Sequence, residues 1–205
     1  MSAERLIYIV DDDDAVRDSL HALLEAKGYQ VATYGSAEAF LEAYRPGPPC
    51  CAVVDIRMPG MDGMALLAKV KELGIAMPII VVTGHGDIAL AVRAMKSGAV
   101  DFVEKPYANA TILDVVGRAF AAAEEHGHHG PAPAEVAARV AGLTPREREV
   151  LEQLVIGNPN KIIAHELKIS PRTVEIHRAN LMKKMQAESL SHLVRMALTA
   201  GIRTA

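Results

Sequence analysis

Short apolar runs alternate with helix-like segments over the first 124 residues, and this alternation restricts the fold more than any other feature. The strand-like runs cover residues 6–10, 31–34, 52–54, 79–82 and 101–103. Helix-like segments separate and follow them at residues 16–27, 37–44, 64–73, 89–97 and about 111–124. Strands joined by helices run parallel, and Val/Ile-rich strands are typical of sheets covered on both faces. The sequence therefore predicts an α/β fold with a doubly wound, five-stranded parallel sheet.

Polar residues directly follow four of the five predicted strands. Asp11 and Asp12 follow the first strand, Asp55 the third, Thr83 the fourth and Lys105 the fifth. The carboxyl ends of parallel strands share one edge of a sheet, so these side chains are expected to converge. Carboxylate oxygens suit a divalent cation such as Mg2+, and a lysine and a hydroxyl beside them suit a phosphoryl group. The combination indicates phosphoryl transfer to a carboxylate.

The run of four aspartates at residues 11–14 has two uses in this interpretation. Asp11 and Asp12 face the sheet edge and the cation, whereas Asp14 occupies the expected N-cap of the next helix and Asp13 precedes it. Carboxylates at a helix N-terminus are stabilising by about 0.3–1 kcal/mol. Asp13 and Asp14 are therefore assigned mainly to capping, and the alternative is that Asp13 adds charge to the metal site. Asp62 is expected to cap the following helix.

A segment rich in Gly, Pro, Ala and His separates this pattern from an entirely helical one. It covers residues 124–135, including "HGHH" at 126–129, and its composition and spacing favour a linker over a metal site. Thr144, Pro145 and Glu147 then form a helix start with a capping box. Further helices are expected at about residues 160–167, 171–185 and 190–200. The predicted organisation is a first domain at residues 1–123, a linker at 124–139 and a four-helix domain at 140–205.

Charge is divided unevenly between the two parts. Residues 1–125 hold 11 Lys and Arg against 18 Asp and Glu, a net charge of −7, whereas residues 126–205 hold 11 against 7, a net charge of +4. A basic second part attracts a polyanion such as DNA. No apolar run approaches a membrane span, the N-terminus lacks a signal region, and the two cysteines, Cys50 and Cys51, are adjacent. A cytoplasmic protein without disulfides or a membrane segment is expected.

The helices at residues 160–167 and 171–185 read as a helix-turn-helix. Basic side chains available for phosphate contacts are Lys161, Arg172, Arg178, Lys183 and Lys184. Glu175, Ile176 and Ala179 share a face of the second helix, one turn after Arg172, and Glu and Ile can contact base edges. A basic, solvated helix is the alternative reading of the same pattern.

Two families resemble these two parts. "VDDDDAV", "VVDIRMPGMDG", "VVTGHGD" and "DFVEKPY" resemble the receiver domain of two-component response regulators. The stretch "LTPREREVLEQLVIGNPNKIIAHELKISPRTVEIHRANLMKKM" resembles the LuxR-type DNA-binding domain. Their order, with "TGHGD", "MKSGAVDFVEKP" and "SPRTVEIHRANLMKKM", is similar to the FixJ subfamily of transcription activators. The resemblance implies a flavodoxin-like sheet in the order 2-1-3-4-5, followed by a LuxR-type helix-turn-helix domain.

The receiver resemblance also implies roles for single residues. Asp55 would be the phosphoacceptor. Asp11, Asp12 and Asp55, with the backbone carbonyl of Arg57, would hold Mg2+, for which Mn2+ or Ca2+ could substitute. Thr83 would hydrogen-bond the phosphoryl group, Lys105 would neutralise its charge, and Phe102 would occupy the aromatic switch position. Arg57 and His85 flank this site.

The family further implies partners. A sensor histidine kinase would phosphorylate the receiver, and the phosphorylated protein would dimerise, bind promoter DNA and act with RNA polymerase. Thr173 and His177 would lie towards the DNA backbone. The expected dimer contacts come from the fourth helix, the fifth strand and the fifth helix. They include Val92, Met95 and Lys96, with Asp101 or Glu104 as the partner of Lys96. Without phosphorylation, the receiver would hold the DNA-binding domain unproductively.

Three alternatives compete with this reading. A Mg2+-dependent phosphatase also uses an aspartate nucleophile, but such enzymes usually carry a second Asp two residues later, where this chain has Arg57. A phosphate-independent scaffold is disfavoured because every site position is intact. The third alternative keeps the receiver with an output domain that binds RNA or protein. The favoured interpretation is a regulator and not an enzyme, apart from hydrolysis of its own acyl phosphate.

Overall fold

A computed structural model of the protein describes residues 5–84, 88–124 and 133–202. The chain divides into two compact units, the first comprising residues 1–85 and 97–128 and the second residues 86–96 and 129–205. Within the described residues, no helix is both long enough and apolar enough to cross a membrane.

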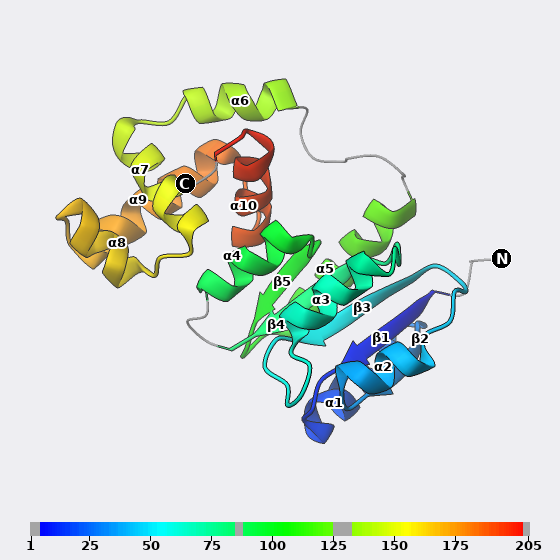
Figure 1. Ribbon diagram of the computed structural model, residues 1–205. Helices are drawn as coiled ribbons and strands as arrows, with labels where there is room; N and C mark the ends of the chain where they lie inside the picture. The colour runs from blue at the N-terminus through cyan, green and yellow to red at the C-terminus, as the bar shows by residue number, and fades with distance from the viewer. Residues whose placement is uncertain (1–4, 85–87, 125–132, 203–205) are drawn as a thin grey trace. The chain divides into compact units, whose positions relative to one another are not determined.

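Five parallel strands form the sheet of the first unit (Figure 1). They are β1 (Leu6–Val10), β2 (Gln30–Tyr34), β3 (Cys50–Asp55), β4 (Ile79–Thr83) and β5 (Asp101–Glu104), in the order β2-β1-β3-β4-β5. The predicted fold class and strand order are confirmed. The register pairs Val10 with Val54 and Thr83 with Glu104, so the residues that follow these strands meet at one edge of the sheet.

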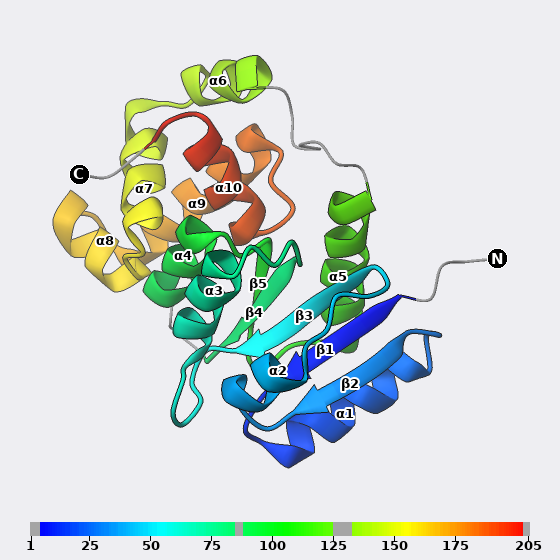
Figure 2. The same ribbon diagram turned by 45° about the vertical axis from the view of Figure 1, so that its right-hand side comes forward.

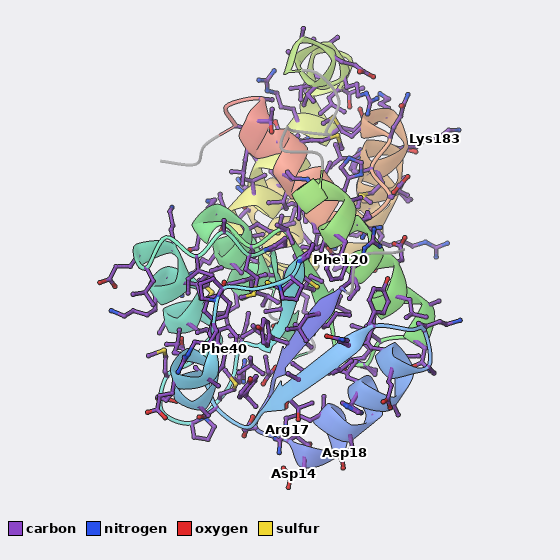
Figure 3. All side chains as sticks on the ribbon, turned by 90° about the vertical axis from the view of Figure 1, so that its right-hand side faces the viewer. Asp14, Arg17, Asp18, Phe40, Phe120 and Lys183 are labelled. Atoms are coloured by element: carbon purple, nitrogen blue, oxygen red, sulfur yellow. The ribbon has the colours of Figure 1, made fainter. Side chains whose placement is uncertain are left out.

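The helices between the strands begin and end close to the predicted positions. They are α1 (Asp14–Glu25), α2 (Ala37–Ala43), α3 (Gly63–Glu72), α4 (Ile88–Ser97) and α5 (Asn109–Glu124). Leu24 of α1 and Phe120 of α5 pack with Ile7 and Ile9 on one face of the sheet. Phe40 of α2 contacts Tyr8 on the other face, and Figure 3 marks both Phe40 and Phe120. Alternate strand residues thus fill two cores, as period-two strands require.

The predicted cap of α1 is wrong by one residue. Asp13, not Asp14, is the N-cap, and its Oδ1 accepts from the backbone N–H groups of Ala15 and Val16. Asp14 is the first helical residue and its exposed carboxylate pairs with Arg17 (Figure 3). The chain turns into the helix one residue earlier than expected because Asp11 Oδ1 accepts the N–H of Asp13 at 3.0 Å. The predicted cap at Asp62 is confirmed by its bond to the N–H of Ala65 at 2.7 Å.

Both cysteines are shielded from solvent in β3. Cys50 is partly buried at the start of β3, and Cys51 is fully buried next to it; both are free thiols. Burial raises the pKa of Cys51 to about 12. The thiols therefore serve as small apolar packing groups, as the sequence indicates.

The second unit contains helices α6 (Pro133–Ala141), α7 (Pro145–Ile156), α8 (Asn160–Leu167), α9 (Pro171–Met185) and α10 (Leu190–Thr199) (Figure 2). Leu151, Leu154, Ile163, Leu181 and Leu193 are fully buried and form the centre of its core. The capping box of Thr144 with Glu147 and the cap of Ser170 are both present, as predicted.

The helix α6 was not predicted. The sequence interpretation places residues 124–139 in a linker, but residues 133–141 form a helix. Val136 and Val140, one helical turn apart, are buried in the core of the second unit. The Arg139 guanidinium also donates to the carbonyl of Met185 at 2.8 Å. Two valines in a stretch of alanines are a weak sequence signal, and packing against the other helices makes the segment helical.

Candidate functional site

Three carboxylates gather at the edge where β1 and β3 end. Asp11 and Asp55 are buried, whereas Asp12 is exposed. Each offers one oxygen, and these oxygens lie within 4.8 Å of one another. The Lys105 ammonium reaches the same place from the end of β5, where its Nζ lies 2.8 Å from Asp11 Oδ2 and 3.3 Å from Asp55 Oδ1. The four residues predicted to converge from β1, β3 and β5 do so.

The loop after β1 is held by its own hydrogen bonds. The N–H of Asp11 donates to the carbonyl of Tyr34 at 3.2 Å, which extends the pairing of β1 with β2. The Arg17 guanidinium donates to the carbonyl of Asp11 at 2.7 Å. These bonds fix the backbone from which Asp11 and Asp12 project.

The loop after β3 leaves room only for glycine at position 63. The N–H of Gly63 donates to the carbonyl of Ile56 at 3.0 Å, and a Cβ at this residue would lie 2.3 Å from the carbonyl oxygen of Asp55. The N–H of Ile56 donates to Val82 at 3.0 Å. Close backbone packing therefore determines where Asp55 stands at the end of the strand.

The charges at this edge are not balanced. Burial raises the pKa of Asp55 above its ordinary value; the Lys105 charge opposes this rise, and the negative charges of Asp11 and Asp12 add to it. Burial acts to lower the pKa of Lys105, but the hydrogen bond with Asp11 and the charges of both carboxylates raise it above its ordinary value. Three carboxylates beside one ammonium favour an additional cation. An all-oxygen set of this kind fits Mg2+.

Thr83 contributes a hydroxyl with an unmet bonding capacity. It ends β4 and is buried, and its Oγ1 has no hydrogen-bond partner among the described residues. Buried hydroxyls are normally paired, because an unpaired one costs about 1–3 kcal/mol. The neighbouring N–H of Lys105 donates to the Thr83 carbonyl at 2.8 Å, so the backbone is fixed while the hydroxyl remains available. Such a group suits an acceptor that arrives later, such as a phosphoryl oxygen.

Phe102, Arg57 and His85 are the other residues that the sequence associates with this site. Phe102 is partly buried, and its partner in the register is Val81, two residues before Thr83. Arg57 is exposed and lies two residues after Asp55, where an aspartate phosphatase would carry its second Asp. His85 lies outside the described residues, as does the histidine segment at 126–129.

The predicted dimer residues differ in burial. Val92 and Met95 are buried, whereas Lys96 and Glu104 are exposed. Asp101 is buried, and Arg118 Nη2 lies 2.8 Å from its Oδ2. Its other oxygen accepts the N–H of Phe102 at 2.8 Å. Glu104 is therefore the more accessible of the two carboxylates suggested for Lys96.

The helix α9 presents an exposed face with the predicted composition. Its exposed side chains include Arg172, Glu175, Ile176, Ala179 and Lys183, and Lys161 of α8 is exposed as well. Ile176 is 54% exposed. Lys183 points outward from the helix (Figure 3). Thr173 and His177 are half-buried, and Thr173 shares a hydrogen bond of 2.7 Å with the Ser170 hydroxyl.

Two basic residues of α9 are engaged within the second unit. Arg178 Nη1 donates to Asn160 Oδ1 at 2.6 Å. Lys184 Nζ lies 2.7 Å from Glu147 Oε2, and this carboxylate is only 5% exposed. Lys184 therefore stabilises the capping box of α7, a role that sequence reasoning missed. The sequence shows the capping-box pattern at Thr144 and Glu147, but it does not show the lysine 37 residues away that pairs with this Glu.

Comparison with known proteins identifies both parts of the chain. Residues 7–117 match the response regulator receiver domain, and residues 141–197 match the LuxR family of bacterial regulatory proteins. The transcriptional regulatory protein FixJ of Azorhizobium caulinodans is 52% identical over 199 residues, which cover 97% of this chain and 94% of that relative. The chain belongs to the FixJ subfamily of response regulators.

Other members of this group support the same assignment. FixJ of Bradyrhizobium diazoefficiens is 48% identical over 202 residues, 98% of each chain. The crystal structure of full-length FixJ from B. japonicum is similar over 100% of both chains, with 46% identity and a TM-score of 0.54. The response regulator StyR is similar over 96% of this chain and 99% of its own, with 38% identity and a TM-score of 0.57.

Membership in the FixJ subfamily establishes the general function. The chain is a response regulator of transcription with a receiver domain and a LuxR-type DNA-binding domain, and it is not a classical enzyme. A receiver domain implies a histidine kinase as partner, and a LuxR-type domain implies DNA binding. Receiver domains generally bind Mg2+ at acidic residues, which here are the cluster of Asp11, Asp12 and Asp55.

Proposed function

We propose that a sensor histidine kinase phosphorylates Asp55, and that the phosphorylated protein dimerises, binds promoter DNA and activates transcription with RNA polymerase. The receiver would cover residues 1–123 and the DNA-binding domain residues 140–205, and α6 would begin in the intervening segment 124–139 and end inside the DNA-binding domain. DNA as a target implies action in the cytoplasm. The main support is the juxtaposition of the carboxylates of Asp11 and Asp55 with Lys105. The neighbouring strand ends in Thr83, whose hydroxyl has no hydrogen-bond partner within the part of the chain that the structure describes.

The side chains at this edge of the sheet, which we call the phosphorylation pocket (Asp11, Asp12, Asp55, Thr83 and Lys105), fit phosphoryl transfer. A carboxylate oxygen of Asp55 forms a bond to phosphorus while the bond from phosphorus to the donor breaks. Lys105 neutralises charge on the resulting acyl phosphate, and the Thr83 hydroxyl donates to one of its oxygens. Asp11, Asp12 and Asp55, with the carbonyl of Arg57, would hold Mg2+, or Mn2+ or Ca2+ in its place. The bound cation would supply charge neutralisation. Attack of water on phosphorus would later release the phosphate and restore Asp55.

The switch would follow from the bond that Thr83 makes. Its movement toward the phosphoryl group vacates space that Phe102 can enter, and two discrete packings form a switch. Val92, Met95 and Lys96, with Asp101 and Glu104, would then supply the dimer interface. The burial of Asp101 against Arg118 favours Glu104 as the residue that pairs with Lys96 across the dimer. Dimers gain affinity for paired half-sites through effective concentration.

The exposed face of α9 supports direct contact with DNA. Arg172, Glu175, Ile176 and Ala179 would face the major groove, because recognition helices present their N-terminal part to base edges. Lys161, Arg178, Lys183 and Lys184, with Thr173 and His177, complete the proposed contacts to the DNA backbone. The contact of Lys184 with Glu147 makes Lys184 the weakest candidate of this set.

Selection of bound sites from random duplex DNA tests the whole proposal. The full chain is first treated with acetyl phosphate and Mg2+, and mass spectrometry records the addition of one phosphoryl group. The Asp55→Asn variant serves as the control and should gain none. Phosphorylated wild-type protein should enrich one sequence motif more strongly than the untreated protein. Absence of an enriched motif would overturn the transcription-factor role, and preferential binding of RNA would replace it with the RNA-binding alternative.

A further inference from the structure

The loop between β3 and α3 directly follows Asp55, and backbone hydrogen bonds hold both of its ends. The bonds of Ile56 to Val82 and of Gly63 to Ile56 secure these ends. Asp62 then caps α3. Between them lie residues 57–61, which include Arg57, whose carbonyl the proposed function assigns to the cation.

The middle of this loop is held by a side chain from a different element. Glu38 lies in the first turn of α2, and its Oε1 accepts the N–H of Met61 at 2.8 Å. The same oxygen sits against Gly60, where an added Cβ would lie only 2.8 Å away. Gly60 has a φ of +73°, a conformation that glycine adopts at little cost. The Glu38 carboxylate thus contacts two consecutive loop residues, Gly60 and Met61. Met61 lies 23 residues after Glu38 in the sequence.

The position and the charge of Glu38 both stabilise its hydrogen bond to the Met61 N–H. Phe40, two residues later in α2, is fully buried against Tyr8, so the helix that carries Glu38 is anchored to the sheet. The Ser36 hydroxyl caps the same helix by accepting the N–H of Ala39 at 3.1 Å. Hydrogen bonds from the backbone N–H groups of Glu38 and Met61 lower the pKa of Glu38 from its ordinary value. The carboxylate is therefore ionised near neutral pH, and charge-assisted bonds of this kind are the stronger ones.

We infer that Glu38 is a positioning residue of the phosphorylation pocket, which holds the β3–α3 loop so that the Arg57 carbonyl meets the cation. The inference rests on the proposed function, because it assumes a cation beside Asp55. Glu38 makes no bond to the cation. It acts through the backbone of Met61 and Gly60, as outer partners of metal ligands commonly do.

Three single variants of the full chain test this role. Glu38→Ala removes the acceptor, whereas Glu38→Gln keeps an oxygen that can accept the Met61 N–H. Glu42→Ala removes an equal charge from the same helix at an exposed position and serves as the control. Calorimetric titration with MgCl2 gives the Kd for Mg2+, and thermal unfolding in the presence of a chelator reports stability separately.

The expected result is a Kd for Mg2+ raised about three- to tenfold in Glu38→Ala. Glu42→Ala should stay within about twofold of the wild type. Glu38→Gln should fall between the wild type and Glu38→Ala, because a neutral acceptor keeps the bond with roughly half of its charge-assisted strength. An equal Kd in Glu38→Ala and Glu42→Ala would overturn the inference. So would equal losses in Glu38→Gln and Glu38→Ala, because these would assign the effect to charge alone. If the wild-type protein itself does not bind Mg2+, the proposed function fails and not only the role of Glu38.

Discussion

The Lys105 ammonium bridges two carboxylates, with its Nζ 2.8 Å from Asp11 Oδ2 and 3.3 Å from Asp55 Oδ1. One positive charge therefore stands where the proposed cation and the phosphoryl group must also be accommodated. Like charges repel more strongly at a partly buried site than in water. Lys105 thus opposes cation binding before phosphorylation and favours the acyl phosphate after it.

Replacement of Lys105 by Met should separate these two effects. We expect Mg2+ to bind about tenfold more tightly at low ionic strength, because a repelling charge is gone. Phosphorylation by acetyl phosphate should become slower, because the incoming oxygens lose one of the two positive charges that neutralise them. Calorimetry with MgCl2 and mass spectrometry against time measure the two effects. Lys71→Met, at an exposed position on α3, is the control, and an unchanged Mg2+ affinity in Lys105→Met would contradict the expectation.

Replacement of Asp55 by Asn should stabilise the metal-free protein at pH 7. Burial raises the pKa of Asp55, so the folded chain holds its proton more tightly than the unfolded chain. Stability therefore falls as pH rises from the ordinary pKa through the folded pKa, and the ionised carboxylate is destabilising above both. The gain from Asn should shrink as pH approaches the ordinary pKa from above. Urea denaturation at pH 7 and pH 4 with a chelator measures it, and a less stable Asn variant at pH 7 would disprove the argument.

Asp13 should matter for stability and not for the cation. Asp13→Ala removes the N-cap of α1 and should lower the free energy of unfolding by about 1 kcal/mol. Asp13→Asn should be close to neutral, because Asn caps about as well as Asp. Urea denaturation of both variants decides the matter. Equal losses in the two variants would show that the negative charge is required and the cap bond is not.

Asp12 and Asp14 should differ in their importance for Mg2+ binding and phosphorylation. Asp12→Asn removes a proposed cation ligand and should abolish Mg2+ binding and phosphorylation. Asp14→Asn should leave both nearly intact, because its exposed carboxylate pairs with Arg17 and is not one of the three clustered carboxylates. Titration with MgCl2 compares the two variants directly. A loss of Mg2+ binding in Asp14→Asn would place that residue in the metal site instead.

Lys183 and Lys184 are neighbours in α9 but should respond differently to substitution. Lys183→Ala should reduce the slope of log K against log salt for duplex DNA by about 1, as loss of a phosphate contact does. Lys184→Ala should reduce that slope less than Lys183→Ala does, and it should lower the free energy of unfolding by about 1 kcal/mol, because the Glu147 carboxylate loses the lysine but keeps the N–H of Thr144. Binding titrations across salt concentrations and urea denaturation test both claims. Equal reductions of the slope in the two variants would show that Lys184 contacts DNA as fully as Lys183 does.

Much of the fold and of the pocket could be predicted because the signals are local. Each strand contains an apolar stretch, Asp55 is the last residue of β3, and Asp11 and Lys105 directly follow β1 and β5. Parallel pairing then brings them together without further information. The cap of α1 was misplaced by one residue, because a run of four aspartates offers equivalent caps and a bond between Asp11 and Asp13 selects one of them. The helix α6 was missed because its stability comes from burying Val136 and Val140 against other helices.

The sequence by itself determined the parallel sheet, the residues at its carboxyl edge and the helix-turn-helix, because periodicity and strand-end chemistry are encoded in adjacent residues. Only the tertiary structure decided which charged groups meet across long separations. Lys184 with Glu147, Glu38 with Met61 and Asp101 with Arg118 each join residues from different elements. Side chains of this length reach any of several neighbours, and packing selects one.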